Sequence, residues 1–168
     1  MIVRAATIDD ARAIGTIHVE TWRAAYAGIV PADYLAALSI DKRESQWRTS
    51  LATPGRPTLV AERDGLLIGW CTFGKSRHKD VAPDAGELYA LYVAEAHWST
   101  GAGRALWLEV RRSLASDGHE DVIVSVLRDN RRAIRFYEKA GFVLDPETEA
   151  PIEVGGASLM HVLMRCPL

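Results

Sequence analysis

The sequence predicts a single α+β domain, and three observations lead to this fold class. The chain has 168 residues, the length of about one domain. Short apolar segments rich in β-branched residues alternate with longer segments whose apolar residues recur at helical spacing. Two of the short segments flank Arg63-Asp64-Gly65, which predicts a β-hairpin. We therefore expect residues 1–168 to form one domain, without an internal repeat or a long linker.

The N-terminal half is predicted to be mainly helical. After a short strand, Thr7-Ile8-Asp9-Asp10 supplies an N-cap signal, and apolar residues follow at helical spacing until Gly28 ends the helix. Pro31 predicts the start of a second helix, since proline is favoured at the first helical position. The predicted elements are a strand over 2–5, a helix ending at Gly28, a short helix from Pro31, a polar helix over 41–51, and hairpin strands over 59–62 and 67–73.

The C-terminal half is predicted to alternate strands and helices. Leu106, Trp107, Val110 and Leu114 form one apolar stripe, and Gly141 follows a second helical pattern as its C-cap. The predicted elements are a polar loop over 75–86, strands over 87–93, 122–127, 142–144 and 158–164, and helices over 102–116 and 130–140.

Composition and charge exclude several function classes. The chain has 20 Lys+Arg against 22 Asp+Glu, a net charge of −2, so no general basic field favours nucleic acid. No apolar run approaches the roughly 20 residues of a membrane span, and the N-terminus lacks a secretory signal. Cys71 and Cys166 are too few for a disulfide framework or a zinc site. We expect a soluble cytoplasmic protein without a metal, a nucleic-acid partner or a membrane partner.

A glycine-rich turn joins the strand over 87–93 to the helix over 102–116. Gly101 and Gly103 lie where the loop becomes the helix, and their missing Cβ atoms let a ligand approach the backbone. The unpartnered first-turn amides and the helix dipole would together hold a pyrophosphate. The alternative, commoner for a lone Gly-x-Gly, is that the glycines only shape the turn. The segment is not a P-loop, and Ala105-Leu106 replace the third glycine of a dinucleotide fingerprint.

The strand over 87–93 departs from strict alternation of its large aliphatic residues. Leu88 is followed by Leu91 and Val93, and this step of three predicts a bulge near Tyr89-Ala90. A bulge would separate the strand from its neighbour and leave backbone groups of Leu91 and Val93 free to pair with an extended ligand. A strand buried on both faces would need no bulge, and the strand alone does not decide between the two.

A second motif spans Asn130-Arg131-Arg132-Ala133-Ile134-Arg135-Phe136-Tyr137-Glu138-Lys139-Ala140-Gly141-Phe142. Asn130 can cap a helix or hold a ligand amide, and Tyr137 lies on the edge of the helix that faces the preceding strand. Together with the glycine turn, this motif resembles the GNAT-type N-acetyltransferase superfamily, and the order of predicted elements agrees along essentially the whole chain. One departure is Trp98, where that family usually has Gln or Arg.

The resemblance implies a GNAT-like acyl-CoA N-acyltransferase fold, with a mixed, mostly antiparallel central sheet flanked by helices. Its fourth and fifth strands run parallel and separate into a V that takes coenzyme A, which favours the bulge. Acetyl-CoA is then the expected cosubstrate, with its pantetheine on the V-facing strand and its pyrophosphate on the glycine turn. The expected cofactor contacts are Leu91, Tyr92, Val93, Ser99, Thr100, Gly101, Ala102, Gly103, Arg104, Asn130 and Arg132.

The resemblance also implies direct transfer of the acetyl group to an amine within a ternary complex. Glu87 is the expected base, acting through water, although an exposed carboxylate at a strand end is an equally good interpretation. Tyr137 is the expected acid that protonates the leaving thiolate.

The first two helices are expected to shape the acceptor pocket. His18, Trp22 and Tyr26 share one helix face, and Trp22 and Tyr26 are the candidate substrate contacts, although plain packing explains Trp22 better. The pattern from Trp22 through Gly28 to Pro31 occurs in many bacterial members of the family. The basic segment 75–80 could reach the adenosine 3′-phosphate or could simply be a solvated loop. The expected acceptor is a primary amine of a small molecule, an amino-acid-like compound or a peptide N-terminus.

Two other functions stay open at this point. The chain could be a non-catalytic acyl-CoA-binding or partner-binding module on the same fold, although it has both Asn130 and Tyr137. It could also bind a nucleotide through Gly101-Ala102-Gly103. Dimerisation is common in the family, so a homodimer is among the expected forms.

Overall fold

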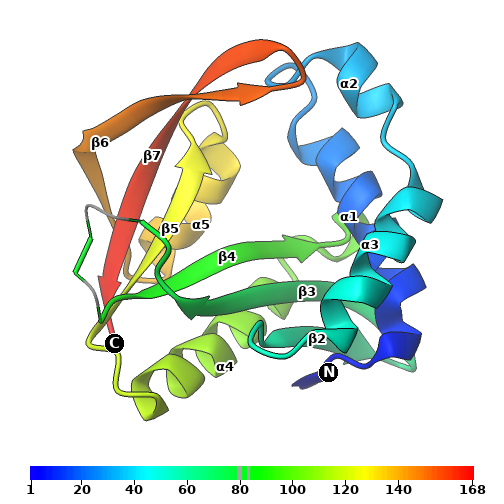
Figure 1. Ribbon diagram of the computed structural model, residues 1–168, viewed down its shortest axis with the longest axis horizontal. Helices are drawn as coiled ribbons and strands as arrows, with labels where there is room; N and C mark the ends of the chain where they lie inside the picture. Colours follow the sequence, from blue (N-terminus) through cyan, green and yellow to red (C-terminus); the bar gives the residue numbers. More distant parts are fainter. Residues whose placement is uncertain (79–80, 83) are drawn as a thin grey trace.

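The computed structural model describes residues 1–78, 81–82 and 84–168, and a seven-stranded sheet runs through its centre (Figure 1). The strand order is β1-β2-β3-β4-β5-β7-β6. Neighbouring strands are antiparallel except β4 and β5, which are parallel. The predicted mixed, mostly antiparallel sheet is therefore confirmed. The strands are β1 (Ile2–Ala5), β2 (Thr58–Arg63), β3 (Leu66–Lys75), β4 (Gly86–Val93), β5 (Asp121–Leu127), β6 (Val143–Val154) and β7 (Ala157–Pro167).

Helices cover both faces of this sheet. The α-helices are α1 (Ala11–Ala25), α2 (Ala32–Ala36), α3 (Ile40–Ala52), α4 (Ala102–Ser116) and α5 (Arg131–Lys139), and short 3₁₀ turns η1 (Ile8–Asp10) and η2 (Glu95–His97) precede α1 and α4. The predicted bounds of α4 are reproduced without change, and the other predicted helices are found within a few residues of their positions. Among the described residues, no helix is long and apolar enough to cross a membrane.

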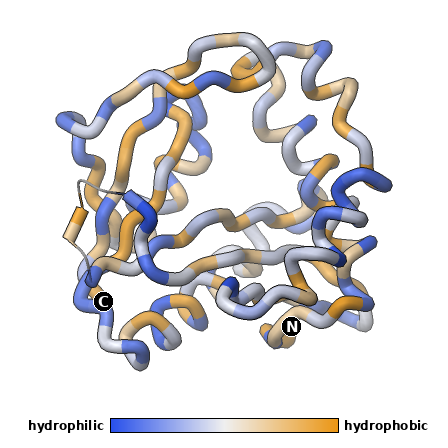
Figure 2. Tube along the Cα trace, in the orientation of Figure 1, coloured by the Kyte–Doolittle hydropathy of each residue, from blue (hydrophilic) through white to orange (hydrophobic). Residues whose placement is uncertain are grey.

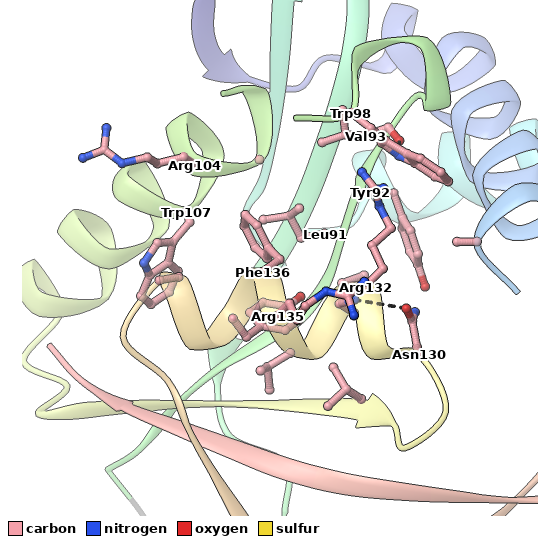
Figure 3. Close-up of a pocket in the computed structure, with 18 of the residues that line it drawn as sticks. Leu91, Tyr92, Val93, Trp98, Arg104, Trp107, Asn130, Arg132, Arg135 and Phe136 are labelled. Carbon is pink, nitrogen blue, oxygen red and sulfur yellow. Dashed lines mark hydrogen bonds between the residues drawn. The ribbon is translucent and has the colours of Figure 1, made fainter. Parts of the chain in front are cut away.

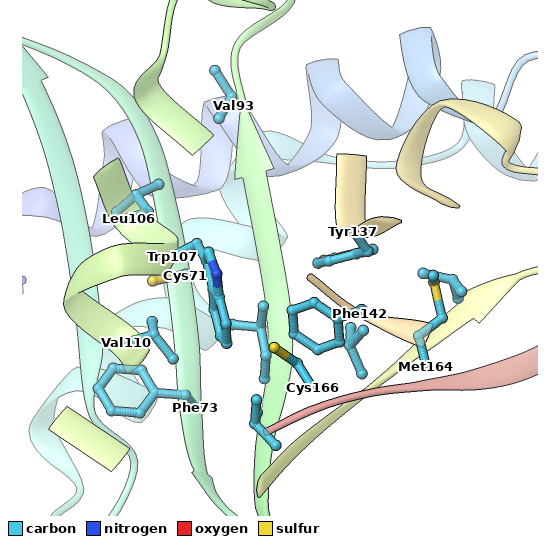
Figure 4. Packing of buried hydrophobic residues seen from close by; sticks show 14 of the residues in the cluster. Cys71, Phe73, Val93, Leu106, Trp107, Val110, Tyr137, Phe142, Met164 and Cys166 are labelled. Atoms are coloured by element: carbon cyan, nitrogen blue, oxygen red, sulfur yellow. The ribbon is translucent and has the colours of Figure 1, made fainter. Parts of the chain in front are cut away.

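Alternation along the strands produces hydrophobic clusters on both faces of the sheet. Side chains such as Cys71 and Phe73 point to one face, where α4 and α5 pack on them (Figure 4). Val60 and Trp70 point to the other face, under α1 and α3. Figure 2 shows that β5 is mostly hydrophobic, as expected for a buried strand. Along α4, hydrophobic and hydrophilic residues alternate, as expected for an amphipathic helix.

The predicted bulge in β4 is present. Thr72 of β3 lies opposite Ala90 and Phe73 lies opposite Leu88, so Tyr89 is the additional residue on β4. β4 and β5 are paired only at their beginnings, through Gly86 with Val122 and Glu87 with Ile123. Beyond these pairs the two strands separate, and this opening positions the site.

The C-terminal hairpin is longer than the sequence predicts. The strand predicted over 142–144 is the first part of β6, which runs for 12 residues and pairs with β7 across a Gly155-Gly156 turn. Both glycines have positive φ (61° and 80°), as a tight two-residue turn requires. Figure 1 shows the hairpin reaching across to α2, where Gly155 approaches Tyr34 so closely that a Cβ there would lie 2.6 Å from the ring.

Candidate active site

A cavity of about 760 Å³ occupies the opening between β4 and β5 (Figure 3). It is bordered by α1, α4, α5 and the loop after β4. Its walls include Leu91 and Val124, on the α4 face of the sheet, and Tyr92 and Ser125, on the opposite face. The cavity therefore extends through the split in the sheet, and its size suits a cofactor-sized ligand.

The edge of β4 that faces this cavity carries backbone groups that β3 does not use. The carbonyl of Val93 accepts hydrogen bonds from Trp98 Nε1 (2.7 Å) and Thr21 Oγ1 (3.3 Å), so it points away from β3. Antiparallel pairs alternate in their bonding, so the backbone groups of Leu91 face the same open edge. Leu91 can then pair with an extended ligand through both groups, whereas the carbonyl of Val93 is already engaged.

The glycine turn presents a row of free amides. In the described structure, none of the backbone N–H groups from Ser99 through Arg104 donates to another protein group. Gly101 is the N-cap of α4 with φ of 92°, and a Cβ there would meet no atom within 4 Å. Gly103 has a different role, because a Cβ there would lie 3.1 Å from the ring of Phe136. Gly101 therefore shapes the turn, and Gly103 lets α4 pack closely on α5.

Thr100 and Ala102 do not belong to the described cavity lining, although both were expected cofactor contacts. The Thr100 hydroxyl donates to the His97 carbonyl (2.8 Å), and the Ala102 side chain is buried in the core. Only their backbone amides are placed to meet a ligand.

The cavity concentrates positive charge. Its described lining contains five Lys and Arg side chains and no Asp or Glu. None of the five takes part in an ion pair among the described residues. Arg104 and Arg132 are among the contacts expected from the sequence. The other three are brought to the cavity by the packing of the helices. The five are Arg104, Arg111, Arg132, Arg135 and Lys139.

Asn130 and Arg132 project into the cavity from the start of α5. Asn130 is buried, and its Oδ1 accepts from the Ala133 amide (3.1 Å), which caps the helix (Figure 3). A ligand would then be held by its Nδ2–H group. The Arg132 guanidinium extends toward the loop after β4 and stacks on the Trp98 ring at 3.8 Å. Trp98, where the family usually has Gln or Arg, thus links the loop after β4 to the start of α5 across the opening.

Tyr137 lines the cavity from α5, and its ring packs between Phe136 and Phe142. Figure 4 shows its position beside Phe142. Its side chain is 5% exposed, and within the described residues its hydroxyl makes no protein hydrogen bond. Burial, with smaller contributions from Tyr26 and Cys71, raises the pKa of Tyr137. The group is therefore protonated at neutral pH and can donate into the cavity.

Glu87, the expected base, does not line the described cavity. It is buried on β4, and its carboxylate accepts from the Arg77 backbone (2.8 Å) and the Arg77 guanidinium (3.2 Å). His78 Nε2 lies 3.8 Å from the same carboxylate. The structure thus places Glu87 under the loop after β3, apart from Tyr137. The rest of the expected basic segment includes Lys79 and Asp80, which lie outside the described residues.

Aromatic residues close the end of the cavity near α1. Tyr26 lines the cavity, and its hydroxyl lies 3.5 Å from that of Tyr92. Trp22 lies behind it, with ring centroids 4.9 Å apart, and is absent from the described lining, which agrees with the packing interpretation. The Tyr92 side chain stacks on His18 at 5.5 Å, so it belongs to this end. By the alternation described above, the backbone groups of Tyr92 point to β3, so Tyr92 does not offer the backbone contact to the cofactor that was expected.

One polar pair at the cavity was not foreseen. Ser125 of β5 lines the cavity, and its Oγ lies 2.7 Å from Nδ1 of His161 on β7. The only signal in the sequence is a serine inside the apolar run Val122-Ile123-Val124-Ser125-Val126. Among the residues that the structure describes, no group of three or more His, Cys, Asp or Glu side chains could hold a metal ion.

Comparison with known proteins gives consistent matches over most of the chain. The model of the acetyltransferase (GNAT) family matches residues 12–142. The uncharacterized N-acetyltransferase YuaI of Bacillus subtilis is 33% identical over 168 residues, which cover 98% of this chain and 92% of that protein.

Solved structures share the fold over the full length. The protein yncA of Salmonella typhimurium, solved with its cofactor acetyl-CoA, is 25% identical with a TM-score of 0.74, covering 100% of this chain and 94% of that chain. The PaiA N-acetyltransferase of Thermoplasma acidophilum, solved with coenzyme A, is 23% identical with a TM-score of 0.74, covering 99% and 98%.

Proposed function

This chain belongs to the GNAT family of acetyltransferases, and on that premise we propose that it transfers the acetyl group of acetyl-CoA directly to the primary amine of a small acceptor. The acceptor is a small molecule, an amino-acid-like compound or a peptide N-terminus. The observation that carries the proposal is the row of free amides from Ser99 to Arg104 beside the split between β4 and β5.

The phosphate groups of acetyl-CoA suit the charges of this cavity. A polyanionic ligand is favoured by the free amides at the N-terminus of α4. It is also favoured by the five cationic side chains, since the described lining contains no acidic residue. The open edge at Leu91 then supports the extended pantetheine as an additional strand. Asn130 Nδ2 supplies a further donor for an amide carbonyl of that arm.

The reaction needs a neutral amine and a protonated leaving group. The amine lone pair forms the new C–N bond at the thioester carbonyl, and the C–S bond breaks. Tyr137 is the proposed acid, because its buried hydroxyl stays protonated and is free to donate to the departing thiolate.

The acceptor end favours a small ligand. Tyr26 and Tyr92 border it with aromatic surface, and the β6–β7 hairpin crosses to α2 above this side of the sheet. The described lining has no carboxylate that would attract a polycationic substrate. A small or singly charged amine, or a free peptide N-terminus, fits this end better than a lysine-rich tail.

The decisive experiment measures CoA release over a panel of amines, together with thermal shifts. We expect acetyl-CoA to raise Tm, ATP and NAD to leave it unchanged, and at least one amine to give acceptor-dependent CoA release. Binding without release on any acceptor would instead support a non-catalytic acyl-CoA-binding module. A shift with ATP or NAD alone would support nucleotide binding.

A further inference from the structure

Ser125 and His161 form a hydrogen-bonded pair at the cavity wall that the proposed mechanism does not use. The 2.7 Å contact joins β5 to β7 across the sheet, where Leu127 lies opposite His161 and Ser125 opposite Leu163. Ile123 and Leu163, two residues away on each strand, pack together on the face opposite the α4 core. By alternation, Ser125 and His161 lie on that same face.

The position of Ser125 in the V gives it access to the reacting groups. Glu87 and Ile123 are the last residues paired between β4 and β5, and Ser125 is two residues beyond on β5. Its hydroxyl therefore lies where the cavity begins to open. It is on the face of the sheet that carries Tyr92, the aromatic acceptor end, and not on the face covered by α4.

The surroundings of His161 keep its imidazole neutral, so that one ring nitrogen has a free lone pair. Burial, and to a smaller extent His78, lower the pKa of His161. His78 comes from the loop after β3 and is itself 3.8 Å from Glu87. From the neighbouring strand ends, Arg128 and Glu149 pair with each other. The imidazole is thus neutral near pH 7, with no carboxylate bonded to it in the described structure.

We propose that Ser125 is a further catalytic residue, which hydrogen-bonds to the acceptor amine and passes its proton to His161. This proposal rests on the acetyltransferase function proposed above. His161 acts through Ser125, so it is a positioning residue, and it passes the proton on to water. Glu87, which is held by Arg77 outside the described cavity, then has no direct part in accepting this proton.

The proton balance closes with two separate routes. The acceptor arrives as R–NH₃⁺ and gives one proton to Ser125 Oγ while the serine proton moves to His161 Nδ1, which later releases it to water. The resulting amine attacks the thioester carbonyl, the C–S bond breaks with its electron pair on sulfur, and Tyr137 protonates that sulfur. The second proton lost from nitrogen restores Tyr137, so the products are the amide, CoA–SH and one proton in water.

The test compares pH profiles of kcat/KM for the acceptor in wild type, Ser125→Ala and His161→Gln. We expect both variants to lose about 10²-fold near pH 7 and to approach wild type as the pH nears the amine's own pKa, about 8 for an α-amine and about 10 for an alkyl amine, where the base is no longer needed. The Kd for acetyl-CoA should not change. His119→Gln is the matched control, because His119 contacts the Asp84 carbonyl away from the described cavity.

Several outcomes would overturn the proposal. An equal loss at every pH would indicate a structural role, and no loss would exclude any role. The same pH-dependent loss in Glu87→Gln, with Ser125→Ala unaffected, would assign the base to Glu87. Detection of an acetyl group on Ser125 by mass spectrometry would mean a covalent route.

A second measurement does not depend on turnover. Nitrogen NMR of the wild-type protein should show His161 as the Nε2–H tautomer near pH 7, with Nδ1 accepting from Ser125, and Ser125→Ala should perturb Nδ1. An Nδ1–H tautomer would overturn the relay even if the enzyme is active. Absence of turnover with the expected tautomer would count against the proposed function and leave the hydrogen-bonded pair supported.

Discussion

Burial sets the protonation state of the side chains around the cavity. It raises the pKa of Tyr137 and of Tyr26, so both hydroxyls stay protonated. It also lowers the pKa of His18 to about 3, so that imidazole is neutral within its aromatic surroundings. These protonation states support the proposed role of Tyr137 as the acid, and the aromatic contacts of His18 indicate a packing role.

We predict that Tyr137→Phe lowers kcat by about 10²-fold and changes the Kd for acetyl-CoA by less than about twofold, because only the proton donor is removed. Steady-state assays and calorimetric titration measure the two quantities. Tyr34→Phe is the control, since Tyr34 packs on the hairpin turn outside the described cavity lining. Unchanged kcat in Tyr137→Phe would remove Tyr137 from the proposed mechanism.

His18 should make the free energy of unfolding depend on pH. Its pKa is about 3 in the folded protein against 6.5 for the free side chain, so the unfolded chain binds the proton first as pH falls. The contribution of neutral His18 to the free energy of unfolding is therefore complete above about pH 6.5 and is lost progressively as pH falls toward 3. Between pH 6.5 and pH 5 the loss is about 2 kcal/mol. Urea unfolding at several pH values measures this dependence. In His18→Gln the free energy of unfolding should change less with pH over this range than in wild type, and an equal change would contradict the assignment.

The site residues that the sequence predicted and those that it did not predict differ in how far apart along the chain their partners lie. Tyr137, Asn130 and the glycine turn belong to short local motifs, so their positions could be predicted. Ser125 and His161 are 36 residues apart and meet only through the register of β5 on β7. No local pattern carries that register, so the pair required the structure.

At the scale of elements, the split between β4 and β5 could be predicted and the long hairpin could not. The irregular step from Leu88 to Leu91 was compatible with a bulge, and the family resemblance favoured the bulge over a strand buried on both faces. In β6, the register shifts between Asp145 and Ala150, and the Thr148 hydroxyl accepts the Leu163 amide (2.9 Å). A side chain thus replaces a backbone acceptor in a segment with two prolines and several acidic residues, which propensity assigns to a loop.

The start of α4 allows a test with a closely matched control. Gly101 and Gly118 flank the two ends of this helix with φ of 92° and 87°, and a Cβ at either would meet no atom within 4 Å. Alanine at either position should therefore cost about 1–2 kcal/mol of stability from backbone strain. Only Gly101→Ala should also weaken acetyl-CoA binding, because only that turn faces the ligand. Equal Kd values for the two variants, measured by titration, would argue against phosphate binding by the free amides from Ser99 to Arg104.

At the scale of the whole molecule, the net charge hides the local field. The chain carries −2, yet the described cavity lining contains five cations and no acid. The acidic residues lie elsewhere, many of them in ion pairs such as Arg12 with Glu44. A balanced composition therefore does not favour an extended polyanion and still allows one phosphate-rich cofactor.

This charge separation predicts different behaviour of two adjacent arginines on α4. Arg111 lines the cavity, whereas Arg112 lies outside it and pairs with Glu109. Arg111→Glu should raise the Kd for acetyl-CoA about tenfold, equivalent to about 1.4 kcal/mol, and reduce its dependence on salt. Arg112→Glu should change neither quantity. Similar losses in both variants would indicate a general charge effect and not a local contact.

The stack of Arg132 on Trp98 also provides an optical reporter at the mouth of the cavity. The indole donates to the Val93 carbonyl and lies 3.8 Å below a guanidinium, so its emission depends on both neighbours. A cofactor entering between β4 and α5 would change that environment. We expect acetyl-CoA to alter the intrinsic fluorescence of the protein, and Trp98→Phe to remove most of the change while the other four tryptophans remain. Binding rates could then be followed by stopped-flow without an attached dye.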